Sequence, residues 1–203
     1  MDAYSHARIS VKHWGGSVED YYPIHAFMDS TKELCSDNRH RILHNLWAIR
    51  RVVIPIFGIV IRNSDSKTVN VKEICEKDHI LPDYQHRFIP TLSDFVQAIA
   101  LPNTTDWKAA FERFHQRYVT SRELSDLLLS PLAITGQLES LLITHNSWFL
   151  NAIVPRVVGE IPYIADFELS PTYLFDHMRF ELWMDNGSAP APSARMLETT
   201  RYP

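Results

Sequence analysis

The chain has 203 residues, enough for one large domain or for a domain of about 100 residues followed by a second helical unit. Hydrophobic residues make up 45% and charged residues 22%, a composition that is ordinary for globular proteins and argues against a disordered chain. The net charge of −4 gives no electrostatic reason to expect nucleic acid or an anionic membrane as the main partner, so neither is expected.

Three features favour a cytoplasmic location. The cysteines Cys35 and Cys75 form no close pair, and we expect them to be reduced. The longest apolar stretch, Val52–Ile61, is interrupted by Pro55 and Gly58 and is too short to cross a membrane. The first residues of the sequence are polar and lack the pattern of a secretion signal.

Three helices are expected before residue 54. The first covers Ala3–Lys12 and is ended by two glycines. Ser17 caps the second, which runs to about Cys35 with Pro23 near its start. The third covers Arg39–Val53, where apolar residues recur with a helical period.

A change of period follows the third helix. Gly58–Arg62 and Thr68–Val71 are rich in β-branched residues and flank a polar turn, which predicts a hairpin. The periodicity of Cys75–Arg87 assigns no structure to that segment, and a further helix is expected over Pro90–Ala100. The predicted fold class is therefore mainly α with a small β-hairpin.

A cluster of Pro, Asn and Thr at 101–105 predicts a domain boundary. Residues 1–100 would form a histidine-rich helical domain with the hairpin, residues 101–185 a helical C-terminal region, and residues 186–203 an extended tail. The helices expected in the C-terminal region are Asp106–Val119, Ser121–Leu129, Leu132–Asn151 and Pro171–Met184. No internal repeat is apparent in the sequence.

Histidines are the main functional signal, because seven of the ten fall within the first 86 residues. His25 and Asp29 are four residues apart on the second predicted helix, so both project from one face. His40 and His44 repeat that spacing on the third. Imidazole and carboxylate groups are the natural ligands of zinc, manganese or iron. The predicted ligands of such a divalent transition metal are His6, His25, Asp29, His40, His44 and His79.

Charged neighbours suggest an outer layer around this site. Asp37 and Arg39 adjoin His40, and Lys32 lies three residues after Asp29. These groups would orient the imidazoles or hold an anion. Any one histidine alone is more often a surface residue or a satisfied core residue, which is how we interpret the histidines outside this set.

An ordered run of motifs carries a family resemblance over about residues 3–99. The motifs are Ser5-His6-Ala7, Trp14-Gly15-Gly16, Glu19-Asp20-Tyr21, Ile24-His25, Asp29-Ser30-Thr31-Lys32, Arg39-His40-Arg41, Leu43-His44 and Asn63-Ser64-Asp65. The sequence resembles a small domain family of unknown function found in bacteria and their phages. The resemblance implies a compact helical domain with a hairpin, in a bacterial host cell or associated with a virion, and implies no activity.

Two functions stay open. One is a metal-binding structural or interaction subunit of a larger bacterial or phage assembly, docking a protein partner or a second copy through its C-terminal half and tail. The other is a metal-dependent hydrolase of a phosphate ester, with Lys32 or Arg39 neutralising the substrate. The His-Asp dipeptide of histidine-aspartate phosphohydrolases is absent, because Asp78-His79 has the reverse order.

Overall fold

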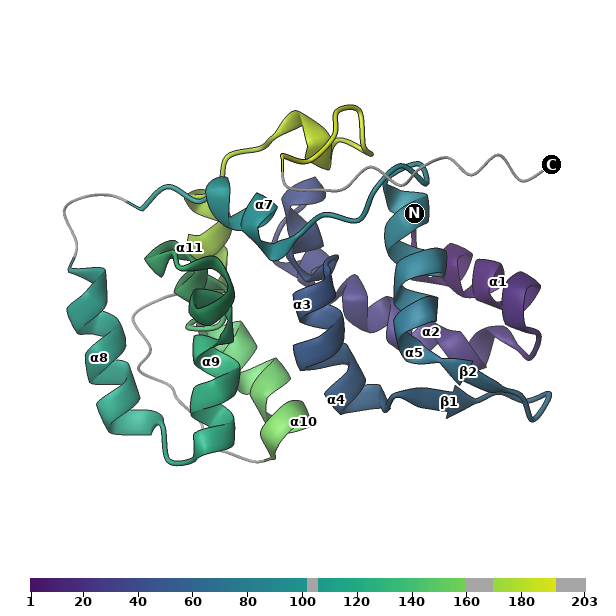
Figure 1. Ribbon diagram of the computed structural model, residues 1–203, viewed down its shortest axis with the longest axis horizontal. Coiled ribbons are helices and arrows are strands. Elements are labelled where there is room, and N and C mark those ends of the chain that lie inside the picture. The colour runs from purple at the N-terminus through teal and green to yellow at the C-terminus, as the bar shows by residue number, and fades with distance from the viewer. Residues whose placement is uncertain (102–105, 160–169, 193–203) are drawn as a thin grey trace. The chain divides into compact units, whose positions relative to one another are not determined.

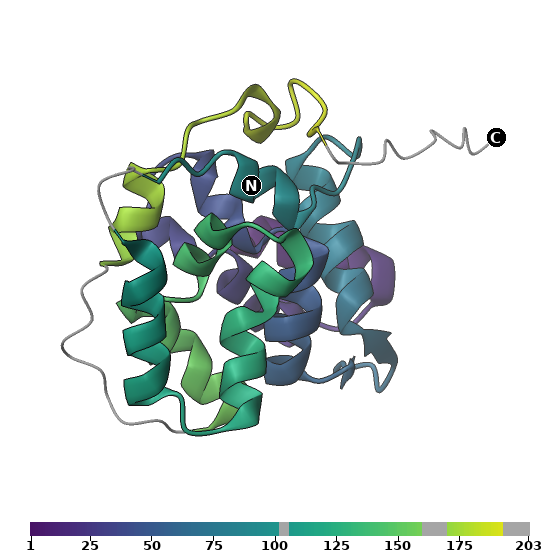
Figure 2. The same ribbon diagram turned by 60° about the vertical axis from the view of Figure 1, so that its left-hand side comes forward.

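Helices and one hairpin make up the structure, a computed structural model whose described part covers residues 1–101, 106–159 and 170–192 (Figures 1 and 2). The fold class predicted from the sequence is confirmed. The chain divides into two compact units, Met1–Asp94 with the chain from Phe180 onward, and Phe95–Arg179. Most of the expected boundary at 101–105 and of the expected tail at 186–203 lies outside the described residues.

The first unit contains most of the elements. In chain order they are α1 (Ala3–Trp14), α2 (Val18–Met28), η1 (Ser30–Glu33), η2 (Asn38–Leu43), α3 (Leu46–Ala48), η3 (Ile49–Val53), α4 (Ile54–Phe57), β1 (Val60–Arg62), β2 (Thr68–Asn70), α5 (Val71–Glu73), η4 (Ile74–Ile80), α6 (Leu81–Asp83), α7 (Leu92–Gln97), which crosses into the second unit, and η7 (Leu182–Met184). Here η1, η2 and η7 are 3-10 turns, whereas η3 and η4 are π-helical stretches within two continuous helices, 46–57 and 71–83.

Capping side chains fix where the first helices begin. Asp2 accepts a hydrogen bond from Ser5 N at 2.7 Å at the start of α1, and Ser17 forms a capping box with Asp20 at the start of α2, as its sequence predicts. The second helix ends at Met28 and not near Cys35, because the chain tightens into η1.

The single helix expected over 39–53 is wrong. After η2 the chain leaves helical geometry at His44, and Asn45 starts the next helix by accepting a hydrogen bond from Ala48 N at 3.1 Å. An asparagine cap of this kind favours a new helix start over a continuous one. His40 and His44 are therefore not one turn apart on a single helix.

The predicted hairpin is confirmed, with Ile61 paired to Val69 in an antiparallel register. It leads directly into the helix 71–83, as Figure 1 shows, and Asn70 caps that helix by accepting a hydrogen bond from Lys72 N at 2.9 Å. This helix occupies a segment to which the sequence pattern assigned no structure.

The segment after Phe180 packs onto the first unit. The ring of Trp183 lies 6.3 Å from that of Tyr84, and Arg41 donates hydrogen bonds to Met184 O at 3.2 Å and Asn186 Oδ1 at 3.0 Å. These contacts close the first unit with residues that are distant in sequence.

The second unit is built from helices. Its elements are α8 (Trp107–Tyr118), α9 (Arg122–Thr135), η5 (Leu138–Ile143), η6 (Phe149–Ile153), α10 (Val154–Val158) and α11 (Pro171–Asp176). The first matches the predicted helix, and α9 begins as predicted but continues to Thr135, beyond the expected end at Leu129. The helix expected over 132–151 is wrong, because Gly136 ends α9 in the left-handed conformation (φ +68°). The helix expected over 171–184 ends at Asp176.

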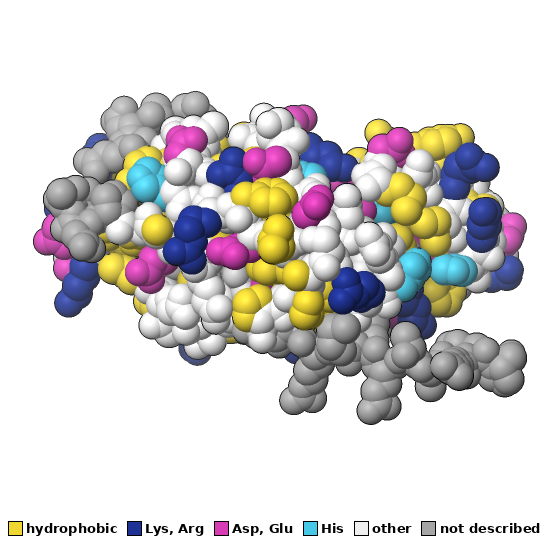
Figure 3. Space-filling view, turned by 90° about the horizontal axis from the view of Figure 1, so that it is seen from above, with side chains coloured by type: hydrophobic (Ala, Val, Ile, Leu, Met, Phe, Trp, Pro, Cys, Tyr) yellow, Lys and Arg dark blue, Asp and Glu magenta, His cyan; other side chains and the backbone are white. Residues whose placement is uncertain are grey.

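Both thiols are free and buried, as predicted, and burial raises the pKa of Cys75. In the described residues, no helix combines the length and apolar character that a membrane crossing requires. On the face drawn in Figure 3, basic and acidic side chains are interspersed.

Candidate metal centre

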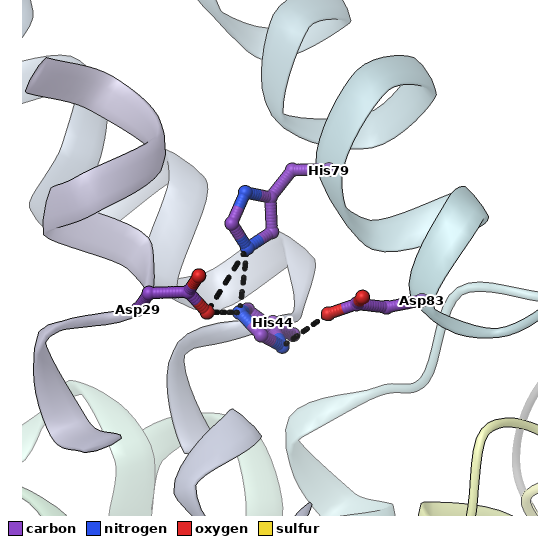
Figure 4. Close-up of side chains that lie close together, drawn as sticks. All are labelled: Asp29, His44, His79 and Asp83. Carbon is purple, nitrogen blue, oxygen red and sulfur yellow. Dashed lines mark hydrogen bonds and ion pairs between the residues drawn. The ribbon is translucent and has the colours of Figure 1, made fainter. Parts of the chain in front are cut away.

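Four side chains from three segments converge inside the first unit (Figure 4). Asp29 follows α2, His44 lies between η2 and α3, and His79 and Asp83 share the helix 71–83. One nitrogen or oxygen of each lies within 4.8 Å of the corresponding atoms of the other three. Both imidazoles are 0% exposed, and the two carboxylate residues are 7% and 4% exposed.

Three of these atoms have the spacing of metal ligands. His79 Nε2 lies 2.9 Å from His44 Nε2 and 3.6 Å from Asp29 Oδ1, and His44 Nε2 lies 3.7 Å from the same oxygen. Ligand atoms about 2.0–2.1 Å from a tetrahedral zinc ion are about 3.3 Å from one another, so the triangle fits one ion. Asp83 Oδ2 lies 3.8 Å from His44 Nδ1, on the other side of that ring.

Several polar atoms of this centre have no hydrogen-bond partner although they are buried. They include Asp29 Oδ1, His44 Nδ1 and Asp83 Oδ2. A buried polar atom without a partner costs about 1–3 kcal/mol. Because these atoms lie together, one metal ion could satisfy them.

The protonation states are those that a metal requires. Burial lowers the pKa of His79 to about 4, although the negative charge of Asp29 acts in the opposite direction, and burial holds the pKa of His44 well below its usual value. Burial would raise the pKa of Asp29, but His79 and His44 lower it overall. At neutral pH the imidazoles are therefore uncharged and the carboxylate is ionised, as ligands must be.

A chain of hydrogen bonds supports His79 from behind. Its Nδ1 lies 3.0 Å from His25 Nδ1, and His25 Nε2 lies 2.9 Å from Ser10 Oγ. The Ser10 hydroxyl donates to Asp78 Oδ2 at 2.8 Å, and Trp14 Nε1 donates to the same oxygen at 2.7 Å. Outer hydrogen bonds of this kind fix the orientation of a metal-binding imidazole.

His6 and His40 flank the centre. The ring of His6 stacks on that of His79 with centroids 4.0 Å apart, and its Nε2 lies 3.3 Å from Asp83 Oδ1. His40 Nε2 lies 4.0 Å from Asp29 Oδ1. All six residues predicted as ligands are thus in one cluster, and three of them belong to the tightest group.

Comparison with known proteins places this cluster in a family. The model of a domain of unknown function, DUF6915, matches residues 1–107, just over half of the chain. The chain belongs to the DUF6915 family. The resemblance to a family of unknown function is confirmed, while a bacterial or phage origin stays a prediction. No curated protein and no solved structure matches the chain.

The charged residues predicted around the centre divide into two groups in the DUF6915 domain. Lys32 Nζ lies 2.7 Å from Asp29 Oδ2, so it holds the oxygen that does not face the imidazoles. Arg39 pairs with Asp37 at 2.9 Å, and this contact lowers the pKa of Asp37 to about 2. That pair reaches the centre only through Asp37 O, which lies 2.6 Å from His40 Nδ1.

Sequence reasoning missed Asp83, which carries a readable signal. It follows His79 by four residues, the spacing that drew attention to His25 and Asp29. Without a helix assigned to 75–87, that spacing had no geometric meaning. The DUF6915 domain also buries Arg41, whose Nε lies 3.4 Å from Asp83 Oδ2.

Proposed function

We propose that the DUF6915 domain binds one divalent transition metal ion through Asp29, His44, His79 and Asp83, and that this ion stabilises the domain. The observation that carries the proposal is the convergence of ligand atoms from three segments, with unpartnered lone pairs, in a buried interior. An ion bound there would tie α2, the break at His44 and the helix 71–83 together.

The carboxylates support this proposal because each is held from one side. Lys32 pairs with Asp29 Oδ2, and the amino group of Met1 lies 2.9 Å from Asp83 Oδ1. In each case the other oxygen, Asp29 Oδ1 or Asp83 Oδ2, is turned toward His44. Such outer contacts orient ligands and raise metal affinity.

The donor set favours zinc, manganese or iron. Two imidazoles beside two carboxylates suit these ions, whereas calcium and magnesium prefer oxygen donors alone and copper(I) prefers sulfur. When bound, such an ion supplies positive charge and Lewis acidity at this position.

Burial supports a structural role over the hydrolase alternative. A structural metal is enclosed by protein ligands, whereas a catalytic metal keeps a position open to water and substrate. All four candidate ligands here are buried. The hydrolase would be favoured instead by turnover of a phosphodiester that requires added manganese or zinc and is lost in His79→Ala.

Elemental analysis of the purified full-length chain tests the proposal. About one ion per chain is expected in the natural sequence, and little or none in His79→Ala. His86→Asn is the matched control, because His86 is exposed and its positive φ of 57° suits asparagine. A His79→Ala variant that keeps the ion would contradict the ligand set.

We also propose that the chain docks a protein partner or a second copy through its C-terminal half. Two exposed apolar side chains close together in sequence support this proposal, with Phe180 47% and Leu182 70% exposed. Light scattering should report a mass above that of one chain, and Leu182→Ser should lower it. A monomer with no partner that co-purifies would contradict this role.

A further inference from the structure

Residues 106–159 of the second unit repeat the order of the main helical elements of residues 2–58. Asp2 and Asp106 cap α1 and α8, two helices of 12 residues each. Each aspartate accepts a hydrogen bond from the backbone amide three residues later, at 2.7 Å and 3.1 Å respectively. Ser17 and Ser121, each fifteen residues later, are the N-caps of α2 and α9. Figures 1 and 2 show α8 and α9 joined by a short turn.

The break before the third helix is also repeated. The 3-10 turns η2 and η5 have six residues each and lead to His44-Asn45 and His145-Asn146. Asn45 Oδ1 accepts a hydrogen bond from the backbone amide three residues later at 3.1 Å, and Asn146 Oδ1 accepts the equivalent hydrogen bond at 3.0 Å. Both side-chain amides donate to the carbonyl three residues back, at 2.9 and 3.2 Å.

The helices that follow share an unusual course. Each contains a tryptophan two residues after the asparagine, then a π-helical stretch, η3 or η6, and a proline. Each ends thirteen residues after the asparagine, at Gly58 and Gly159, with φ of 91° and 93°. Helical hairpins are common, but π-helical stretches are rare, so their recurrence at one place in the same order argues against coincidence.

The residues of the second unit at the positions that match the metal centre of the first unit are mostly apolar. Counting from the shared caps, the pairs are His6 with Ala110, Ser10 with Phe114, His25 with Leu129, and Asp29 with Ala133. Counting from the shared asparagines, His44 pairs with His145. Apolar side chains therefore stand in the second unit at four polar positions of the first, and one histidine is retained.

The retained histidine is satisfied without a metal. His145 Nε2 lies 2.8 Å from His115 Nε2, and its Nδ1 lies 3.0 Å from Leu141 O. Its ring packs against Phe111 and Phe114, with centroids 5.0 and 5.3 Å away. The matching residues of α1 are Ala7 and Ser10, which are small enough to leave room for imidazoles.

We infer that the second unit is a degenerate copy of the DUF6915 fold that has lost the polar residues of the metal centre and folds without metal. The repeat rests on the architecture alone, and its metal-free state rests on the proposed function of the first unit. Among the described residues, the group able to hold a metal lies in the first unit. The copy lies beyond the matched residues 1–107 for nearly all its length.

Metal content and hydrogen exchange of the full chain test the metal-free state. About one ion per chain is expected in the natural sequence and in His145→Ala, and none in His44→Ala. Chelation should speed amide exchange in α2 and in the helix 71–83 and leave α8, α9 and η6 unchanged. Two ions per chain, with one lost in His145→Ala, would overturn the inference. No ion in the natural sequence would refute the proposed function instead.

The repeated architecture is tested without metal by Asn45→Ala and Asn146→Ala. Loss of an N-cap should speed exchange of the amides at the start of the following helix about fivefold in each variant, at residues 46–49 and 147–150. A response confined to one of the two variants would show that the two breaks differ in structure and would overturn the repeat.

Discussion

Asp78 and His79 are neighbours in sequence and are also joined through space by Ser10 and His25. Asp78 accepts the hydroxyl proton of Ser10 at 2.8 Å, so that hydroxyl has no proton left for His25. His25 must then donate from Nε2 to Ser10 Oγ, and its Nδ1 must accept from His79 Nδ1 at 3.0 Å. His79 Nε2 is left as a bare lone pair that faces His44 and Asp29.

This series of hydrogen bonds predicts the effect of Ser10→Ala. Without the hydroxyl, the proton on His79 is free to move to Nε2, where it would block the metal. We expect metal affinity to fall about 10- to 100-fold while the ion still binds at one per chain. Competition with a chelating dye measures the affinity.

Ser30→Ala is the matched control for that variant. Ser30 is half-buried and its hydroxyl donates a hydrogen bond to Phe27 O at 2.7 Å. The Ser30→Ala variant therefore also loses a hydroxyl hydrogen bond, but a local one at the end of α2. Equal losses of affinity in the two variants would contradict a role of Ser10 in setting the tautomer.

Asp83→Asn should impair both metal binding and folding. Asparagine keeps the shape of the side chain but removes the charge that faces Arg41, which is 3% exposed. Leaving a buried cation unpaired costs about 3–5 kcal/mol, and the hydrogen bonds of Arg41 to Met184 O and Asn186 offset part of it. Urea unfolding of metal-free protein measures the loss.

Asp65→Asn is the control for this variant, because the Asp65 carboxylate is exposed. It should change the free energy of unfolding by less than about 0.5 kcal/mol.

The sequence predicted the elements whose signals are local. The cap at Ser17 and the β-branched runs of the hairpin depend on neighbouring residues, and the structure agrees with them. The break at Asn45 could not be seen, because apolar periodicity continues across it and the cap depends on one side-chain hydrogen bond.

The centre could be predicted only in part for a similar reason. His25 and Asp29 were placed on one helix face because their segment has clear helical signals. His79 was predicted as a ligand without an assigned helix, and Asp83 was missed, because both lie in a helix with a π-helical stretch that disturbs the 3.6-residue period. The repeat stayed hidden because its shared features are caps, a break and a glycine, while the buried side chains of the two copies differ.

Acidification should destabilise the first unit between about pH 6.5 and pH 4. Burial lowers the pKa of His79 to about 4 and that of His25 to about 2, while unfolded histidine titrates near 6.5. In this range the unfolded chain binds more protons than the folded one. The free energy of unfolding therefore decreases by about 1.4 kcal/mol for each pH unit of acidification and for each such histidine. Urea titrations of chelated protein at several pH values measure the slope.

Two variants calibrate that slope. His25→Asn removes one histidine whose pKa is lowered in the folded state. The slope of the free energy of unfolding against pH should therefore decrease by the contribution of one histidine. His86→Asn removes an exposed histidine and should leave it unchanged. A slope that is the same in all three proteins would contradict the assignment to buried histidines.

Gly187→Ala tests whether the segment after Phe180 packs on the first unit. Gly187 has a φ of 73°, and an added Cβ would lie 2.9 Å from Tyr84 O, a backbone atom that cannot turn aside. Gly159 has a φ of 93° and a ψ of 178° with nothing within 4 Å of such a Cβ, so Gly159→Ala costs only the backbone preference, about 1–3 kcal/mol. Because of the added overlap, Gly187→Ala should lower the melting temperature by several degrees more. Equal shifts would mean that the segment is detached from Tyr84 in solution.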